Sequence, residues 1–229
     1  MSRLDSLRDR HRGQRCVIVA NGPSLNRMDL GFLRREHVIG MNKIFLGFER
    51  FGFYPRYYLA VNPKVVQQAL PQIRALNCVK FIGLRAAREA GLNEDALTHL
   101  IDTDDPPARF STDLSRGMHE GWTVTHAALQ TAYHLGFADV VLIGMDHRYA
   151  FEGAPNEARQ MTGADPNHFS EHYFGHGQTW DNPDLQQSEA SYRSALEAFQ
   201  RDGRRVVDAT LDGACTIFPK ADHRQLFAR

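Results

Sequence analysis

The sequence of 229 residues is 42% hydrophobic and 24% charged, which is enough apolar material for one α/β domain spanning residues 1–229. Basic and acidic residues number 27 each, so the overall charge favours neither a nucleic-acid partner nor an anionic membrane. Three separated cysteines lack the spacing of a zinc site or a disulfide framework, and no apolar run reaches the ~20 residues of a membrane span. Because the first residues are also too polar for a signal peptide, we expect a cytoplasmic protein.

Six short apolar runs predict the strands of a parallel sheet. The first is "CVIVA" at 16–20 and the last is "RVVDAT" at 205–210; the others lie at 37–42, 57–62, 78–84 and 139–146. Stretches with helical spacing separate several of the runs, which is typical of βαβ units. In one of them, small residues from Ala127 to Ala132 share a stripe that we expect to pack closely on the sheet and to end at Gly136. The pattern predicts a Rossmann-like, mostly parallel, doubly wound α/β fold.

Two long segments, 101–121 and 151–185, do not fit a strand or helix pattern. The second is rich in glycine, proline and asparagine and precedes a predicted C-terminal helix and strand. Long irregular segments inside a compact domain are commonly lids or substrate loops. We therefore expect 151–185 to form a lid on the acceptor side of a site.

The first three predicted strands all end in asparagine, at Asn21, Asn42 and Asn62. Ligands of open α/β sheets bind outside the carboxyl ends of the strands, and a carboxamide can recognise a phosphate, a ribose or a base. The alternative is that asparagine simply favours strand ends because it bonds nearby backbone. The turn after the first strand, "NGPS" at 21–24, has neither the GxGxxG nor the P-loop pattern. A dinucleotide dehydrogenase or a P-loop NTPase is therefore disfavoured.

An ordered set of motifs resembles a known group of enzymes. The motifs are "VIVANGPSL", "GMNKI", "AVNPKVV", "WTVTHAALQTAYHLGFADVVLIGMD", "YAF" at 149–151 and "HYFGH" at 172–176. They are similar to segments of the bacterial CMP-sialic-acid-dependent sialyltransferases of glycosyltransferase family 42. They also resemble the broader MptE-like group, which includes 6-hydroxymethylpterin diphosphokinases. The C-terminal part, with a long helix and a final "Asp-Ala-Thr" strand, looks more like the MptE-like proteins.

The resemblance implies a metal-independent glycosyltransferase without a cofactor. It would transfer a sugar from a CMP- or other nucleotide-activated donor to a glycan or other hydroxyl acceptor. His172 would be the general base, and Tyr149 would donate a hydrogen bond to the leaving phosphate. The residues that would hold the nucleotide and the donor are Asn21, Gly22, Pro23, Ser24, Asn42, Asn62, Thr123, Thr125 and Asp146. The sequence departs from the sialyltransferase pattern at Val124 and Gly121, where that family has serine and arginine.

Other interpretations stay open. An MptE-like diphosphokinase would use Mg²⁺ and ATP on a hydroxymethylpterin or similar alcohol, with Asp146 or the acidic cluster at 102–105 near the metal. A third possibility is a non-catalytic nucleotide- or glycan-binding module. His172 could be a purely structural histidine, and with His168 and His176 it has the i, i+4, i+8 spacing of a metal site, although the surrounding glycines disfavour a helix. Trp122 and Trp180 either cover a sugar or base or pack in the core. A homo-oligomer is compatible with the sequence.

Overall fold

The centre of the protein is a seven-stranded sheet in which all strands run parallel. The structure is a computed structural model that describes residues 3–104 and 108–228. The strands, in the spatial order β11-β8-β1-β2-β3-β4-β5, are β11 (Arg205–Asp208), β8 (Asp139–Ile143), β1 (Arg15–Val19), β2 (His37–Met41), β3 (Tyr57–Ala60), β4 (Val79–Gly83) and β5 (Thr98–Ile101). The predicted doubly wound α/β fold is confirmed. Only β5 was not predicted, because this edge strand is short and two of its four residues are polar.

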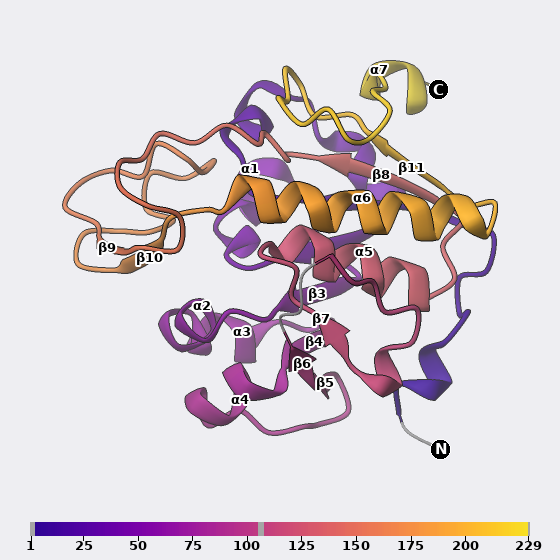
Figure 1. The fold of residues 1–229 in the computed structure, drawn as a ribbon, viewed down its shortest axis with the longest axis horizontal. Helices are drawn as coiled ribbons and strands as arrows, with labels where there is room; N and C mark the ends of the chain where they lie inside the picture. Colours follow the sequence, from indigo (N-terminus) through magenta and orange to yellow (C-terminus); the bar gives the residue numbers. More distant parts are fainter. Residues whose placement is uncertain (1–2, 105–107, 229) are drawn as a thin grey trace.

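Helices cover both faces of the sheet (Figure 1). Along β1 the side chains alternate, so that Cys16 and Ile18 pack in one core with residues of α5 and α6, and Val17 and Val19 pack in a second core with residues of α2 and α4. The helices are α1 (Phe48–Phe51), α2 (Pro63–Gln68), α3 (Leu70–Ala75), α4 (Leu84–Ala90), α5 (Val124–His134), α6 (Leu185–Arg201) and α7 (His223–Leu226). Short 3-10 helices complete the connections: η1 (Asp5–Leu7), η2 (Pro23–Arg27), η3 (Gly31–Arg35), η4 (Ile44–Gly47) and η5 (Leu114–Arg116).

The predicted small-residue helix is α5. Thr123 caps it by accepting a hydrogen bond from the Thr125 amide, and Ala127, Ala128 and Ala132 are fully buried. Gly136 follows with a φ of +89°, a left-handed conformation that suits glycine after a helix. Small side chains allow α5 to lie directly against β1, β2 and β3.

The direction in which the sheet grows changes at β1. From β1 the chain adds β2 to β5 on one side, and then places β8 and β11 on the other side. In doubly wound sheets a crevice forms at such a reversal, outside the carboxyl ends of the strands. Asn21 and Asp146 follow β1 and β8, so the topology places both residues beside this crevice.

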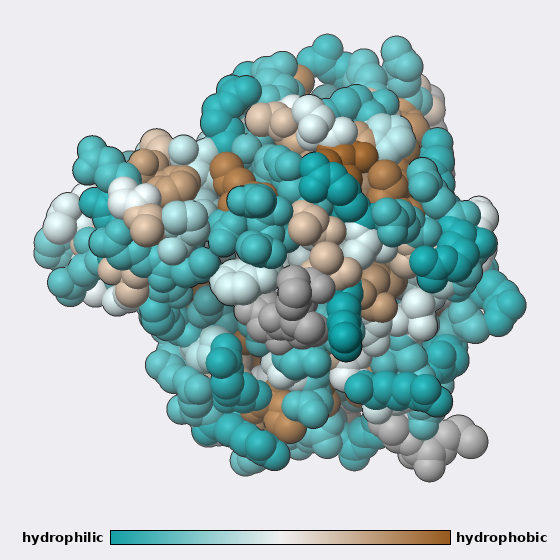
Figure 2. Space-filling model, in the orientation of Figure 1, coloured by the Kyte–Doolittle hydropathy of each residue, from teal (hydrophilic) through white to brown (hydrophobic). Residues whose placement is uncertain are grey.

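Segment 151–185 projects from the body of the molecule at the left of Figure 1, and Figure 2 shows that this projection is mainly hydrophilic. It contains the antiparallel strands β9 (Ala158–Gln160) and β10 (Thr179–Asp181), with Trp180 opposite Arg159. Segment 101–121 contains η5 and the parallel pair β6 (Thr103–Asp104) and β7 (Met118–His119). Asp105 of the acidic cluster lies outside the described residues. Among the described helices, none has the length and apolar character needed to cross a membrane.

Candidate functional site

A cavity of about 440 Å³ opens at the carboxyl ends of β1, β2, β3 and β8. The tip of each strand and the start of α5 supply part of its wall, and segment 151–185 supplies another part. The structure therefore brings most of the residues predicted for the site into one place. The predicted residues that line the cavity are Asn21, Gly22, Asn42, Asn62, Thr123, Thr125, Asp146 and Tyr149.

The three asparagines make different contacts. Asn21 donates from Nδ2 to the carbonyl of Met41 at 3.3 Å, while its Oδ1 is buried and has no hydrogen-bond partner in the described part of the chain. The Oδ1 of Asn42 is also buried and unpartnered, and its backbone has a left-handed φ of +49°. Asn62 instead caps α2, because its Oδ1 accepts from the amides of Lys64 at 2.9 Å and Val65 at 3.3 Å. The backbone-bonding interpretation therefore holds for the oxygen of Asn62 and not for the side-chain oxygens of Asn21 and Asn42.

The "NGPS" turn holds Asp146 in position. One carboxylate oxygen of Asp146 accepts from the Ser24 amide at 2.9 Å, and the other accepts from the Ser24 hydroxyl at 2.6 Å. Gly22 lies so close to this carboxylate that an added Cβ would collide with it. Burial raises the pKa of Asp146. Ser24 and Pro23 are not part of the cavity wall, so the structure gives Ser24 a positioning contact with Asp146 and gives Pro23 the first position of η2.

Strained backbone is concentrated at this cavity. The described residues include seven non-glycine residues with positive φ, and four of them line it: Asn42, Trp122, His147 and Asn156. Such conformations cost free energy and persist where the surrounding structure enforces them, which is common at functional sites. The strained residues therefore also indicate that the functional site lies at the carboxyl ends of the strands.

The predicted base, His172, does not line the cavity. Its side chain is 82% exposed, and its Nε2 lies 3.5 Å from a carboxylate oxygen of the exposed Glu171. The turn before it places a different histidine in the wall, His168. The base role of His172 stays a prediction without a supporting contact in the structure.

His168 is held in a way that suits a proton acceptor. Its Nδ1 lies 2.7 Å from Oδ2 of Asp165, and its ring stacks on Tyr173 at a centroid distance of 3.9 Å. The Asp165 carboxylate is buried and also accepts hydrogen bonds from the amides of Asn167 and Phe174. With Nδ1 donating to this fixed carboxylate, Nε2 is the nitrogen that can accept a proton. The sequence signal for this pair is the i, i+3 spacing of aspartate and histidine in "DPNH" at 165–168, and the pair was not predicted from it.

The structure offers no converging set of metal ligands in the described parts of the chain. No group of three histidine, cysteine, aspartate or glutamate residues there could hold a metal ion. His168 binds Asp165, whereas His176 lies 3.2 Å from the carbonyl of Thr162. Asp146, the residue predicted for Mg²⁺ in a diphosphokinase, already accepts two hydrogen bonds from Ser24. These residues do not by themselves form a magnesium site.

Segment 151–185 is fastened to the body by a buried lysine. Lys43 is 4% exposed and donates to Oε1 of Gln68, the carbonyl of Tyr173 and Oε1 of Gln178 at 2.7–3.0 Å. Burial lowers the pKa of Lys43 to about 8. A second fastening is the ion pair between Lys64 and Asp181 at 2.5 Å, in which both residues line the cavity. Neither lysine was predicted as functional, although Lys43 lies in the motif "GMNKI" and Lys64 in the motif "AVNPKVV".

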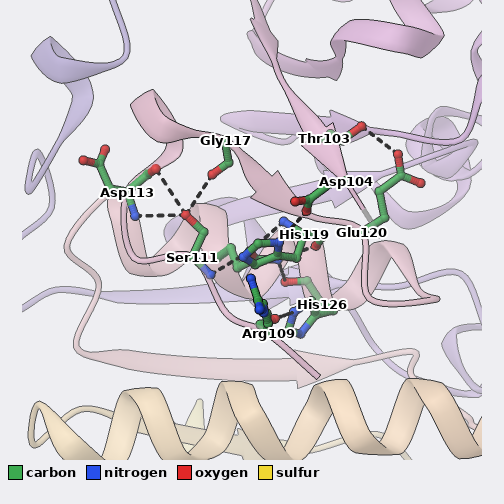
Figure 3. A network of polar contacts seen from close by, with 10 residues as sticks. Thr103, Asp104, Arg109, Ser111, Asp113, Gly117, His119, Glu120 and His126 are labelled. Carbon is green, nitrogen blue, oxygen red and sulfur yellow. Dashed lines mark hydrogen bonds and ion pairs between the residues drawn. The ribbon is translucent and has the colours of Figure 1, made fainter. Parts of the chain in front are cut away.

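A polar network supports the wall on the side of α5 (Figure 3). The Gln130 carboxamide accepts from the amides of Ser111 and His119, and donates to the carbonyl of His119 at 2.7 Å. The His119 ring bonds Asp104, and Thr103 donates to Glu120 at 2.7 Å. The network fixes the residues that lead into α5, including Glu120, which lines the cavity.

The fold and this cavity define a doubly wound α/β protein with a polar site at its topological switch point. Residues 2–152 match the sequence profile of the family described as "6-hydroxymethylpterin diphosphokinase MptE-like". The chain therefore belongs to this MptE-like family, which confirms the resemblance stated from its motifs. No match is found among curated proteins.

The fold is also similar to a solved structure, that of the MAf glycosyltransferase from Magnetospirillum magneticum AMB-1. The TM-score is 0.57 and the identity 15%, and the similarity covers 97% of this chain and 37% of that chain. At this identity the likeness shows the fold alone. The chain spans little more than a third of the length of that enzyme.

Proposed function

We propose that the protein is a glycosyltransferase that moves a sugar from a nucleotide-activated donor to a hydroxyl acceptor. Membership of the MptE-like family and the fold shared with a glycosyltransferase support a transferase of either the glycosyl or the diphosphate type. The choice between the two rests on the hydrogen-bonding groups of the cavity.

The observation that carries the proposal is a set of buried carboxamide oxygens without partners. Asn21, Asn42 and Asn182 line the cavity, and the Oδ1 atom of each is buried and accepts no hydrogen bond from the residues that the structure describes. Nδ2 of Asn21 and of Asn182 donates to backbone carbonyls, which identifies the oxygen as the unpaired atom in both. Unpaired acceptors are satisfied by ligands that donate hydrogen bonds. Sugar hydroxyls donate, whereas the oxygens of ionised phosphates only accept, so the wall suits a sugar better than a triphosphate.

The reaction requires an acceptor oxygen to lose a proton as it attacks the anomeric carbon of the donor. In our proposal, Nε2 of His168 takes this proton, and Asp165 orients the ring and stabilises the imidazolium that forms. A bond forms between the acceptor oxygen and the anomeric carbon, and the bond from that carbon to the phosphate oxygen breaks. The electron pair leaves with the nucleotide phosphate. The phenol of Tyr149, which is protonated at neutral pH, donates a hydrogen bond to the departing phosphate.

The first experiment identifies the donor class. Purified protein is heated in the presence of CMP, CDP, UDP, GDP or ATP, each with and without Mg²⁺, and of the corresponding nucleotide sugars. A ligand at 100 times its dissociation constant stabilises the folded state by ~2.7 kcal/mol, which a melting curve resolves. We expect stabilisation by one nucleotide and its sugar conjugate without Mg²⁺. Melting temperatures that do not respond to any of them would contradict the proposal.

The second experiment compares two histidines that lie four residues apart. His168→Ala should lower the turnover of the nucleotide sugar by ~10²–10⁴, because a positioned base acts mainly in the transition state, and donor affinity should change little. His172→Ala is the matched control, since it removes an exposed imidazole from the same segment. We expect this variant to keep native turnover. The reverse result would assign the base to His172, as the sequence resemblance implies.

A diphosphokinase acting on 6-hydroxymethylpterin or a similar alcohol is the second candidate function. The family description and the position of Asp146 at the tip of β8 favour it. It predicts stabilisation by ATP only with Mg²⁺, and an activity that EDTA and Asp146→Asn both abolish. His168→Ala would affect this activity less strongly than the loss of Asp146.

A further inference from the structure

The turn that leads into α5 has an unusual backbone. Residues 120–123 form a β-turn closed by a hydrogen bond of 3.3 Å from the Thr123 amide to the Glu120 carbonyl. Its two central residues both have positive φ, +62° at Gly121 and +63° at Trp122. This combination is the signature of a type I′ turn, whose second central position is usually glycine. A tryptophan there is strained, so the surrounding structure must enforce it.

The neighbours of the turn leave its backbone little freedom. A Cβ added at Gly121 would collide with the ring of His126 and lie 3.0 Å from Oγ of Ser191, so no other residue fits without rearrangement. The carbonyl of Trp122 accepts a hydrogen bond from the Ser188 hydroxyl of α6 at 3.3 Å. Thr123 then caps α5. The backbone of Trp122 is therefore held in place by its contacts with α5 and α6.

The indole is open to a ligand. Trp122 lines the cavity and is 38% exposed, one of four large hydrophobic residues with high exposure in the described part of the chain. Trp180, in contrast, contacts Tyr149, Phe151 and Phe174. No aromatic ring contact or indole N–H hydrogen bond of Trp122 occurs among the described residues. A strained and exposed tryptophan at the mouth of a cavity is best explained by a partner that stacks on it.

The charged residues of the cavity wall indicate which part of a bound ligand would lie against Trp122. Glu120 precedes the turn, and Asp184 caps α6 one turn before Ser188, so two carboxylates lie on the Trp122 side. The basic residues of the cavity wall are Arg148 and Lys64; Lys64 lies in the first turn of α2, on the opposite face of the sheet, and pairs with Asp181. Arg85 lies 4.0 Å from the Glu120 carboxylate. A phosphate would be repelled near Glu120 and Asp184, whereas an uncharged aromatic ring would not. We propose that Trp122 is the stacking platform for the nucleobase of the donor nucleotide; this inference rests on the proposed function.

Fluorescence gives a direct test, because the sequence contains only two tryptophans. In Trp180→Phe, the emission comes from Trp122 alone. CMP, UMP, AMP and GMP are titrated against this variant, with ribose 5-phosphate and a neutral disaccharide as ligands that lack a base. We expect a nucleotide that stabilises the native protein to quench Trp122, and ribose 5-phosphate to leave the emission unchanged.

Affinity measurements separate the indole from the backbone. Base stacking on an aromatic ring is worth a roughly 5- to 150-fold change in Kd. Trp122→Gly removes the indole and tolerates the left-handed turn, and Trp122→Ala removes the indole but keeps the strain. Both variants should lose 5- to 150-fold in nucleotide affinity, Trp122→Phe should lose less, and the affinity for ribose 5-phosphate should not change.

Three results would overturn the inference. Native nucleotide affinity in Trp122→Gly would show that the indole makes no contact with the base, while nucleotide binding itself and the proposed function would stand. Quenching by the disaccharide and not by any nucleotide would assign the platform to the acceptor. If no nucleotide stabilises the native protein, the proposed function fails, and the stacking inference fails with it.

Discussion

The sheet with α5 and α6 and the segment 151–185 differ in the balance of apolar and polar contacts that hold them in place. The first is packed with apolar side chains, such as the buried alanines of α5 and the aromatic cluster around Phe199. The second adds Phe169, Tyr173 and Phe174 to the core on the other face of the sheet, and hydrogen bonds and an ion pair also fasten it to the body through Lys43, Lys64 and Gln68. Polar contacts are worth less net free energy than the burial of a large apolar side chain. We therefore expect the sheet and its helices to set the stability, and the segment to open separately.

The largest effect should follow from a substitution in the apolar core. Phe199 is fully buried in α6, and its ring lies 5.2 Å from that of Tyr133 and 6.0 Å from that of Phe110. Phe199→Ala should lower the free energy of unfolding by ~3–5 kcal/mol, because it removes a large apolar side chain and leaves a cavity. Urea denaturation measures the loss. Trp180→Ala in segment 151–185 is the comparison, and an equal loss there would show that the two regions unfold as one unit.

The buried lysine should produce an effect of about 3 kcal/mol that depends on pH. Burial lowers the pKa of Lys43 from 10.5 in the unfolded chain to about 8. Between these values the native lysine has released its proton while the unfolded chain still binds one, so the free energy of unfolding rises with pH. Below pH 8 both states are protonated and the dependence ends. The shift corresponds to about 3 kcal/mol between pH 8 and 10.5.

Lys43→Met tests this directly, because other groups that titrate in the same range cancel in the comparison. The difference in unfolding free energy between the native protein and Lys43→Met is measured by urea denaturation from pH 7 to pH 10.5. We expect it to be constant up to about pH 8 and then to shift in favour of the native protein. A difference independent of pH would mean that the ammonium of Lys43 is not desolvated, and that the segment is not closed over it.

The smallest effects separate two asparagines at the border between the regions. Asn62→Ala should lower the free energy of unfolding by ~1 kcal/mol, because it removes the cap of α2. Asn42→Ala should weaken nucleotide binding by ~0.5–1.5 kcal/mol, because the Asn42 oxygen is buried and has no partner within residues 3–104 and 108–228. Asn42→Gly is its control, since glycine accepts the φ of +49° and removes only the side chain. Melting curves and ligand titrations on all three variants give both quantities; unchanged nucleotide affinity in both Asn42 variants would rule out a direct role.

Local patterns in the sequence determined the framework of this protein. A continuous apolar run predicts a buried parallel strand. The six runs of this sequence correspond to β1, β2, β3, β4, β8 and β11. Because β1, β2, β3 and β8 run parallel, Asn21, Asn42, Asn62 and Asp146 lie along one edge of the sheet. The short edge strand β5 was missed, because half of its residues are polar and its pattern carries no such signal.

Only the tertiary structure decided what the side chains at this edge do. The sequence treats Asn42 and Asn62 alike, yet the oxygen of Asn62 caps α2, whereas that of Asn42, just before η4, is buried without a hydrogen-bond partner among the described residues. His168 and His172 lie four positions apart in the sequence. The non-helical backbone of 168–174 brings His168 into the cavity wall and leaves His172 in solvent. The turn that presents Trp122 needs a glycine at 121, because His126 and Ser191 leave no room for a side chain there. Apart from the cap of Asn62, which bonds the neighbouring amides of Lys64 and Val65, these outcomes depend on contacts between separate elements, and a local pattern contains no information about such contacts.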